Sequence, residues 1–133
     1  MASIIADTHV VIWLVTNSPR LSVKARNAIR QTIDDGFPVL MSAVSVAELI
    51  YATEKLRLPK AVLNVILDTT HRDHYGLKVV PFDMQIAETM TSIPRDIVPD
   101  LPDRMIAATS IALDLPLITA DGKIHRSGIP IIW

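Results

Sequence analysis

Short apolar runs alternate along the chain with longer segments in which apolar residues recur at helical spacing. Each run is too short for a helix and is typical of a strand that is buried on both faces. The predicted strands are Ser3–Ala6, Pro38–Ser42, Leu77–Pro81 and Leu117–Thr119, with Ile131–Trp133 as a candidate fifth strand. The predicted helices are Val10–Val15, 22–36, Val44–Leu56, Lys60–His71, Met84–Thr91 and Asp103–Leu113, with a structured loop at Ile93–Pro102. This alternation predicts an α/β fold, a three-layer α/β/α sandwich with a mostly parallel central sheet.

Capping signals support several of these boundaries. Ser22 precedes a segment with helical periodicity, and Ser is a favoured residue at the start of a helix. Gly36 follows the same segment, where glycine commonly ends a helix. Asp83 stands directly before Met84 and is expected to cap the next helix.

Composition limits the classes to which the protein can belong. The 133 residues are 50% hydrophobic and 20% charged, and the mean hydropathy is +0.35. We expect one domain over residues 1–133, with an apolar surface that a partner or a second copy covers. Cysteine is absent, which excludes disulfides and thiolate chemistry and is compatible with the cytoplasm. We expect no signal peptide and no membrane span. The formal net charge of -1 means that any nucleic acid must be held by local basic residues.

Two acidic residues follow the first two predicted strands. Asp7 ends the first strand, where open parallel sheets bind their ligands. Helix capping explains Asp7 equally well. Glu48 lies one helical turn after the second strand and is expected to point back toward Asp7. The alternative is a capping box at Ser45-Val46-Ala47-Glu48, in which the acid would bond to the start of its own helix.

Two more acids occupy equivalent positions later in the chain. Asp103 begins a predicted helix and shares a face with Ile106 and Ser110, so it lies at the edge of the sheet-packed side. Its alternative role is to complement the helix dipole, although Asp100 is the more natural cap. Asp121 follows the fourth strand, and Asp-Gly there is also a common hairpin turn.

All four acids occupy equivalent positions in the predicted fold, because each lies just after a strand or in the first turn of a helix that packs on the sheet. Four ionised carboxylates that meet there repel one another. A divalent cation removes that repulsion, and hard oxygen ligands select Mg²⁺ or Mn²⁺. Such ions activate water and stabilise the leaving oxygen of a phosphodiester.

Together these motifs resemble the PIN domain, and most closely the VapC-type toxins of bacterial and archaeal toxin–antitoxin pairs. No single motif decides the resemblance, but their order along a chain of this length is specific. The matching segments are Asp7-Thr8-His9 with Trp13, Ser45–Leu49, 100–109, Leu117–Asp121 and the terminal Trp133.

The resemblance implies an Mg²⁺- or Mn²⁺-dependent endoribonuclease that acts on RNA in the cytoplasm, often forms a homodimer and is inhibited by a small VapB-type antitoxin. The family's acidic quartet carries over to Asp7, Glu48, Asp103 and Asp121, and Thr119 matches the hydroxyl residue that supports the last acid. Gly122 stands where relatives often have a bulkier residue, which leaves open whether Asp121 binds metal directly.

Other functions remain as alternatives. A non-catalytic RNA- or protein-binding module would keep the fold and bind metal without cleaving RNA. A receiver-like signalling domain fits poorly, because it needs one central Asp and a later Lys. A haloacid-dehalogenase-type phosphatase needs a second acid two residues after Asp7, where this chain has His9. The chain also lacks a glycine-rich phosphate loop.

Several residues near the acids have two interpretations. Arg104, Lys123 and Arg126 flank the acids and either bind RNA phosphates or remain solvated. His71 and His74 are interpreted as surface residues. The two tryptophans, Trp13 and Trp133, are interpreted as core or interface residues rather than as platforms for stacked bases.

Overall fold

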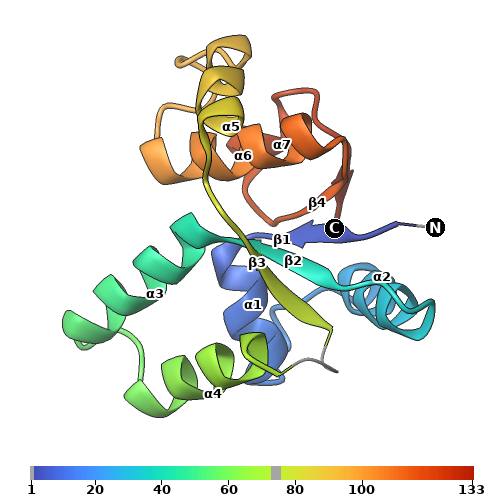
Figure 1. Cartoon of the computed structure of the whole chain (residues 1–133), viewed down its shortest axis with the longest axis vertical. Coiled ribbons are helices and arrows are strands. Elements are labelled where there is room, and N and C mark those ends of the chain that lie inside the picture. Colours follow the sequence, from blue (N-terminus) through green and yellow to red (C-terminus); the bar gives the residue numbers. More distant parts are fainter. Residues whose placement is uncertain (1, 73–75) are drawn as a thin grey trace.

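Five parallel strands form a central sheet in the part of the protein that the structure describes. The structure is a computed structural model, and it describes residues 2–72 and 76–133. The strands follow the order β3-β2-β1-β4-β5 across the sheet (Figure 1), and all neighbouring pairs are parallel. They are β1 (Ile4–Ala6), β2 (Val39–Ser42), β3 (Leu77–Val80), β4 (Leu117–Ile118) and β5 (Ile131–Ile132). The predicted α/β fold, including the fifth strand, is confirmed.

Helices cover both faces of this sheet, so the fold has three layers (Figure 1). Helices α1–α4 pack on one face and α5–α7 on the other. In the described residues the helices are α1 (Thr8–Val15), α2 (Val23–Asp34), α3 (Ala43–Glu54), α4 (Lys60–Thr70), α5 (Met84–Thr89), α6 (Leu101–Leu113) and α7 (Gly122–His125). A short 3₁₀ turn, Met90–Ser92, extends α5.

The sheet divides the interior into two hydrophobic cores because successive strand residues point to opposite faces. Ile4 and Ala6 of β1 belong to the core beneath α1–α4. Ile5, between them, belongs to the core beneath α5–α7. In the same way Leu117 and Ile118 of β4 enter different cores. Strand residues that point to either face are therefore mostly apolar, with Ser42 in β2 and Lys78 in β3 as the polar positions.

Helix α6 begins at Leu101 rather than at the predicted Asp103. Asp100 is its N-cap, and the Asp100 carboxylate accepts a hydrogen bond of 3.1 Å from the Asp103 backbone N–H. Pro102 lies in the first turn, where a missing N–H group costs nothing because that group would have no helical partner. Two other differences occur next to the acids: α1 begins at Thr8 instead of Val10, and α7 was not predicted.

The predicted caps at Ser22 and Asp83 are confirmed. Ser22 accepts from the Ala25 N–H at 3.0 Å, and Asp83 accepts from the Ile86 N–H at 2.9 Å. Gly36 lies just beyond α2 with a φ of 88°, a conformation that glycine adopts easily.

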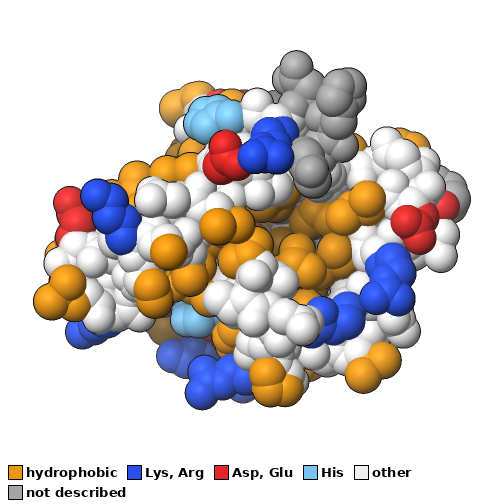
Figure 2. Space-filling model, turned by 90° about the horizontal axis from the view of Figure 1, so that it is seen from below, with side chains coloured by type: hydrophobic (Ala, Val, Ile, Leu, Met, Phe, Trp, Pro, Cys, Tyr) orange, Lys and Arg blue, Asp and Glu red, His pale blue; other side chains and the backbone are white. Residues whose placement is uncertain are grey.

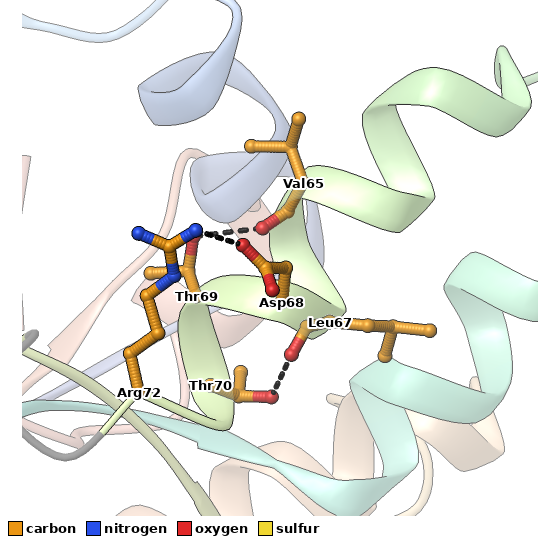
Figure 3. Close-up of polar contacts among 6 residues, drawn as sticks. All are labelled: Val65, Leu67, Asp68, Thr69, Thr70 and Arg72. Atoms are coloured by element: carbon orange, nitrogen blue, oxygen red, sulfur yellow. Dashed lines mark hydrogen bonds and ion pairs between the residues drawn. The ribbon is translucent and has the colours of Figure 1, made fainter.

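Helix α4 ends in a set of local polar contacts (Figure 3). Thr69 and Thr70 donate side-chain hydrogen bonds to backbone carbonyls of the preceding turn, each at 2.7 Å. Asp68 and Arg72 form an ion pair at 2.7 Å, but both side chains are more than half exposed, so the pair adds little stability. His71 is exposed at this end, as predicted, and His74 lies outside the described residues.

The sheet order places a topological switch point between β1 and β4. From β1 the chain adds β2 and β3 on one side, and it then crosses to add β4 and β5 on the other. In open parallel sheets the crevice for ligands lies outside the carboxyl ends of the strands at such a reversal. None of the described helices is both long and apolar enough to span a membrane.

Candidate functional site

Asp7 lies at the carboxyl end of β1 and is only 7% exposed. It is the N-cap of α1, and its Oδ1 accepts from the Thr8 N–H at 2.7 Å. Its Oδ2 accepts from the Thr119 hydroxyl at 2.7 Å. Burial raises the pKa of Asp7, and these hydrogen bonds partly offset that increase. Asp7 therefore caps α1 and also lies at the carboxyl end of β1, so the two interpretations of this residue are compatible.

Glu48 points from the second turn of α3 toward the same place. Its Oε1 lies 2.7 Å from the Thr8 hydroxyl, which also lies 2.7 Å from the Ser45 hydroxyl. The cap of α3 is Ser42, whose hydroxyl accepts from the Val44 N–H at 3.1 Å. The alternative of a capping box is therefore wrong, because Ser45 and Glu48 contact Thr8 instead of the start of their own helix.

Asp103 and Asp121 complete the set from the other side of the sheet. Asp121 is the N-cap of α7, and its Oδ1 accepts from the N–H groups of Lys123 and Ile124 at 2.8 and 3.3 Å. The hairpin-turn alternative is therefore wrong. Burial is the main cause that raises the pKa of Asp103 from 3.8 to about 7. The negative charges of Asp100, Asp121 and Asp7 and a hydrogen bond with Asp121 raise it further.

The four carboxylates are close enough to influence one another electrostatically. Asp121 raises the pKa of Asp7, and Asp7 raises the pKa values of both Glu48 and Asp103. His9 opposes this repulsion at Asp7 and Glu48. Four segments that lie far apart in the sequence thus place negative charge at the ends of β1 and β4.

Comparison with known proteins shows which family has this arrangement. The sequence profile of the PIN domain matches residues 4–129. The chain belongs to the PIN domain family. A curated relative, Ribonuclease VapC22 from Mycobacterium tuberculosis (strain ATCC 25618 / H37Rv), is 27% identical over 136 residues, and the match covers 100% of both chains.

Two solved structures share the fold of this PIN domain. DNA-bound VapBC from Salmonella typhimurium has a TM-score of 0.74 and 24% identity, over 98% of this chain and 97% of that one. VapBC2 from Rickettsia felis, bound to a DNA fragment from their promoter, has a TM-score of 0.72 and 16% identity, over 97% and 96% of the two chains. These likenesses extend over nearly the whole chain.

The donor chemistry of the site fits a hard divalent cation. In the described residues no three acidic or histidine side chains form a ready-made ion cage. Mg²⁺ does not require such a cage, because it keeps several waters and is commonly held by one or two carboxylates. Buried carboxylates with raised pKa values provide oxygen ligands whose repulsion a cation would relieve.

Thr119 contributes to the site in two directions. Its hydroxyl donates to Asp7 and accepts from the Asp121 backbone N–H at 3.0 Å. Its carbonyl oxygen lies 2.8 Å from Nε2 of His125 in α7, and that nitrogen must carry the proton because a carbonyl can only accept. The sequence interpretation missed His125, and it also missed the contacts of Thr8 and Ser45. The only signal for these three residues was a polar side chain within about one helical turn of a candidate acid in the sequence.

The basic residues beside the acids differ in whether their side chains are bonded within the protein or exposed to solvent. Arg104 donates to the carbonyls of Met90 and Ile93 at 2.8 and 3.0 Å, and its buried Nε has no hydrogen-bond partner among the described residues. It therefore holds the end of the α5 segment rather than extending into solvent. Lys123 in α7 and Arg126 at the end of that helix are both exposed.

A groove of about 950 Å³ opens beside Glu48 in this PIN domain. Apolar residues form most of its lining, many of them on α1 and α3, and Arg20, Lys55 and Arg57 add positive charge. Trp13 lines one side, where its ring centroid lies 5.8 Å from those of both His9 and Trp133. Both tryptophans pack against the core, in agreement with their interpretation as core residues.

Proposed function

We propose that this PIN domain is a metal-dependent endoribonuclease and the toxin of a type II toxin–antitoxin pair. The observation that carries the proposal is the convergence of Asp7, Glu48, Asp103 and Asp121 at the ends of β1 and β4. The relatives support it, since one is named a ribonuclease and the two solved structures are toxin–antitoxin complexes with DNA. We propose the cytoplasm, where RNA and its translation machinery are found, as the place of action.

The reaction is the hydrolysis of an RNA phosphodiester. A water oxygen forms a bond to phosphorus, the bond from phosphorus to O3′ breaks, and a proton passes to O3′. The products are a 5′-phosphate and a 3′-hydroxyl. Bound Mg²⁺ or Mn²⁺ supplies activation of the water and neutralisation of charge on the phosphate.

The residues of this chain hold and orient the reacting groups. Asp7, Asp103 and Glu48 are the proposed ligands of the cation, with Asp121 as a direct or indirect fourth. Thr119 orients Asp7 and fixes the backbone of Asp121. Lys123 and Arg126 are the proposed contacts to RNA phosphates, because both are exposed, one in the helix that Asp121 caps and the other at the end of that helix.

We further propose that the groove beside Glu48 binds a VapB-type antitoxin. Its apolar lining suits the apolar face of a helix, and its basic residues suit acidic residues along the edges of that helix. An antitoxin in this groove would cover Glu48 and block access of RNA to the acids.

A homodimer is proposed from exposed apolar surface. Viewed from the side of α1–α4, apolar side chains gather between scattered basic ones (Figure 2). Two apolar residues of this part of the chain, Ile50 and Leu56, are 40% and 92% exposed. Contiguous apolar surface of this kind is typical of interfaces between proteins.

The test compares three proteins after brief induction in a bacterial host: wild type, Asp7→Asn and the control Asp96→Asn, which changes an exposed acid outside the site. New RNA 5′ ends are then mapped. We expect ends at defined sites with wild type and Asp96→Asn and none with Asp7→Asn. Cleavage by purified Asp7→Asn would overturn the assignment of the site. Purified wild type that binds Mn²⁺ but cleaves no RNA from its native organism would favour the binding module instead.

A further inference from the structure

Thr8, the first residue of α1, forms hydrogen bonds with two of the proposed metal ligands. Its backbone N–H donates to Asp7 Oδ1, and its hydroxyl lies 2.7 Å from Glu48 Oε1. Thr8 itself is 6% exposed, so water does not readily replace these contacts. One buried residue thus joins the carboxylate that follows β1 to the carboxylate of α3.

The hydroxyl groups of Ser45 and Thr8 and the carboxylate of Glu48 form a chain of hydrogen bonds in which one direction of donation is favoured. A hydroxyl has a single proton, so if Thr8 donates to Glu48 it must accept from Ser45. Ser45 is fully buried and lies one turn before Glu48 on α3. A hydrogen bond to an ionised carboxylate is stronger than one between neutral groups, which makes Thr8 to Glu48 the favoured direction.

This chain fixes one oxygen of Glu48 and leaves the other unoccupied. In the described part of the protein no hydrogen bond to Glu48 Oε2 is present, whereas Oε1 is held by Thr8. A glutamate side chain has several rotatable bonds, and ordering it costs conformational entropy. A contact already present in the folded protein lowers that cost when an ion binds.

We propose that Thr8 is a positioning residue whose hydroxyl, supported by Ser45, sets the Glu48 carboxylate relative to Asp7 for binding one divalent cation. This inference rests on the proposed function, because it concerns ligands of the proposed metal site. Partners that orient metal ligands in this way contribute about 10- to 100-fold to metal affinity. The effect therefore lies in metal binding and not in the chemistry of RNA.

The experiment measures Mn²⁺ affinity without RNA, from the electron paramagnetic resonance signal of free Mn²⁺ during titration. Thr8→Val removes the hydroxyl and keeps the shape, and we expect affinity to fall about tenfold. Thr8→Ser restores the hydroxyl and should recover most of that loss. The matched control is Thr32→Val, because Thr32 is 7% exposed and its hydroxyl donates to a backbone carbonyl in α2. Its affinity should equal that of wild type.

A second readout distinguishes positioning from general damage to the fold. Thr8→Val should need more Mn²⁺ for half-maximal RNA cleavage but approach the wild-type rate when Mn²⁺ saturates. If Thr8→Val does not fold, Ser45→Ala serves instead, with a smaller loss of affinity because Thr8 can still donate to Glu48. Wild-type affinity in folded Thr8→Val, or no recovery in Thr8→Ser, would overturn the inference.

Asp7→Asn separates this inference from the proposed function. If Asp7→Asn loses Mn²⁺ binding while Thr8→Val retains it, the positioning role is wrong and the metal site stands. If Asp7→Asn binds Mn²⁺ as wild type does, the metal site itself is wrong, and the positioning role fails with it.

Discussion

Replacement of Asp103 by Asn should stabilise the metal-free protein at alkaline pH. Folding raises the pKa of Asp103 from 3.8 to about 7, mainly through burial and then through the charges of Asp100, Asp121 and Asp7. The folded protein therefore holds this proton more tightly than the unfolded chain does. As pH rises from about 4 to 7, the folded state loses stability relative to the unfolded state, because it must give up the proton against that repulsion.

The size of the effect follows from the same pKa values. A change from 3.8 to about 7 corresponds to about 4 kcal/mol when no solvent screens the charge. Asp103 is partly exposed, so screening by water reduces the figure to about 1–2 kcal/mol. Asn has the same shape and no charge, and the variant should gain that amount at pH 8 and close to nothing at pH 4.

The assay is urea unfolding in EDTA at pH 4 and pH 8, followed by tryptophan fluorescence. Asp96→Asn is the control, since it removes an exposed acid that lies outside the site. The difference between Asp103→Asn and wild type should be larger at pH 8, and Mn²⁺ should stabilise wild type more than the variant. An equal difference at the two pH values would refute the conclusion that burial and neighbouring acids oppose ionisation of Asp103.

Three further predictions concern packing, capping and the groove. Ile106→Ala should lower the free energy of unfolding by about 2–5 kcal/mol, measured with urea, because Ile106 is fully buried on the side of α6 that packs against the core. Ser22→Ala should lower it by about 1 kcal/mol, because the Ala25 N–H loses its partner. Tyr51→Ala should weaken binding of the antitoxin about tenfold by calorimetry, since Tyr51 lines the groove and tyrosine is a frequent anchor in interfaces.

Each of these changes has a matched control. Ile111→Ala, on the exposed side of α6, should cost much less than Ile106→Ala, and equal losses would contradict the buried position. Ser22→Asn keeps a capping oxygen and should retain stability; a loss as large as that of Ser22→Ala would argue against the cap. Val65→Ala removes an exposed apolar group outside the groove, so an effect equal to that of Tyr51→Ala would exclude a specific role for the groove.

The sequence alone determined the layers of this protein and the positions of its acids along the chain. The runs that became β1 and β2 are apolar at nearly every position, as strands covered on both faces must be. Because such runs alternate with segments of helical periodicity, a parallel sheet is the expected arrangement of the strands. Caps at Ser22 and Asp83 were predictable for the same reason, because each bonds to a backbone group only three residues away.

Only the tertiary structure decided what the acids contact. The sequence left open a local bond for Glu48 at the start of its own helix, whereas the folded chain pairs Glu48 with Thr8, 40 residues away. Likewise Thr119 reaches Asp7 across 112 residues. Such contacts depend on the order of β1 and β4 in the sheet, which no local pattern contains. Helix capping and burial depend on residues that are neighbours in the sequence. A site made by four separate segments forms only when the sheet brings the ends of its strands together.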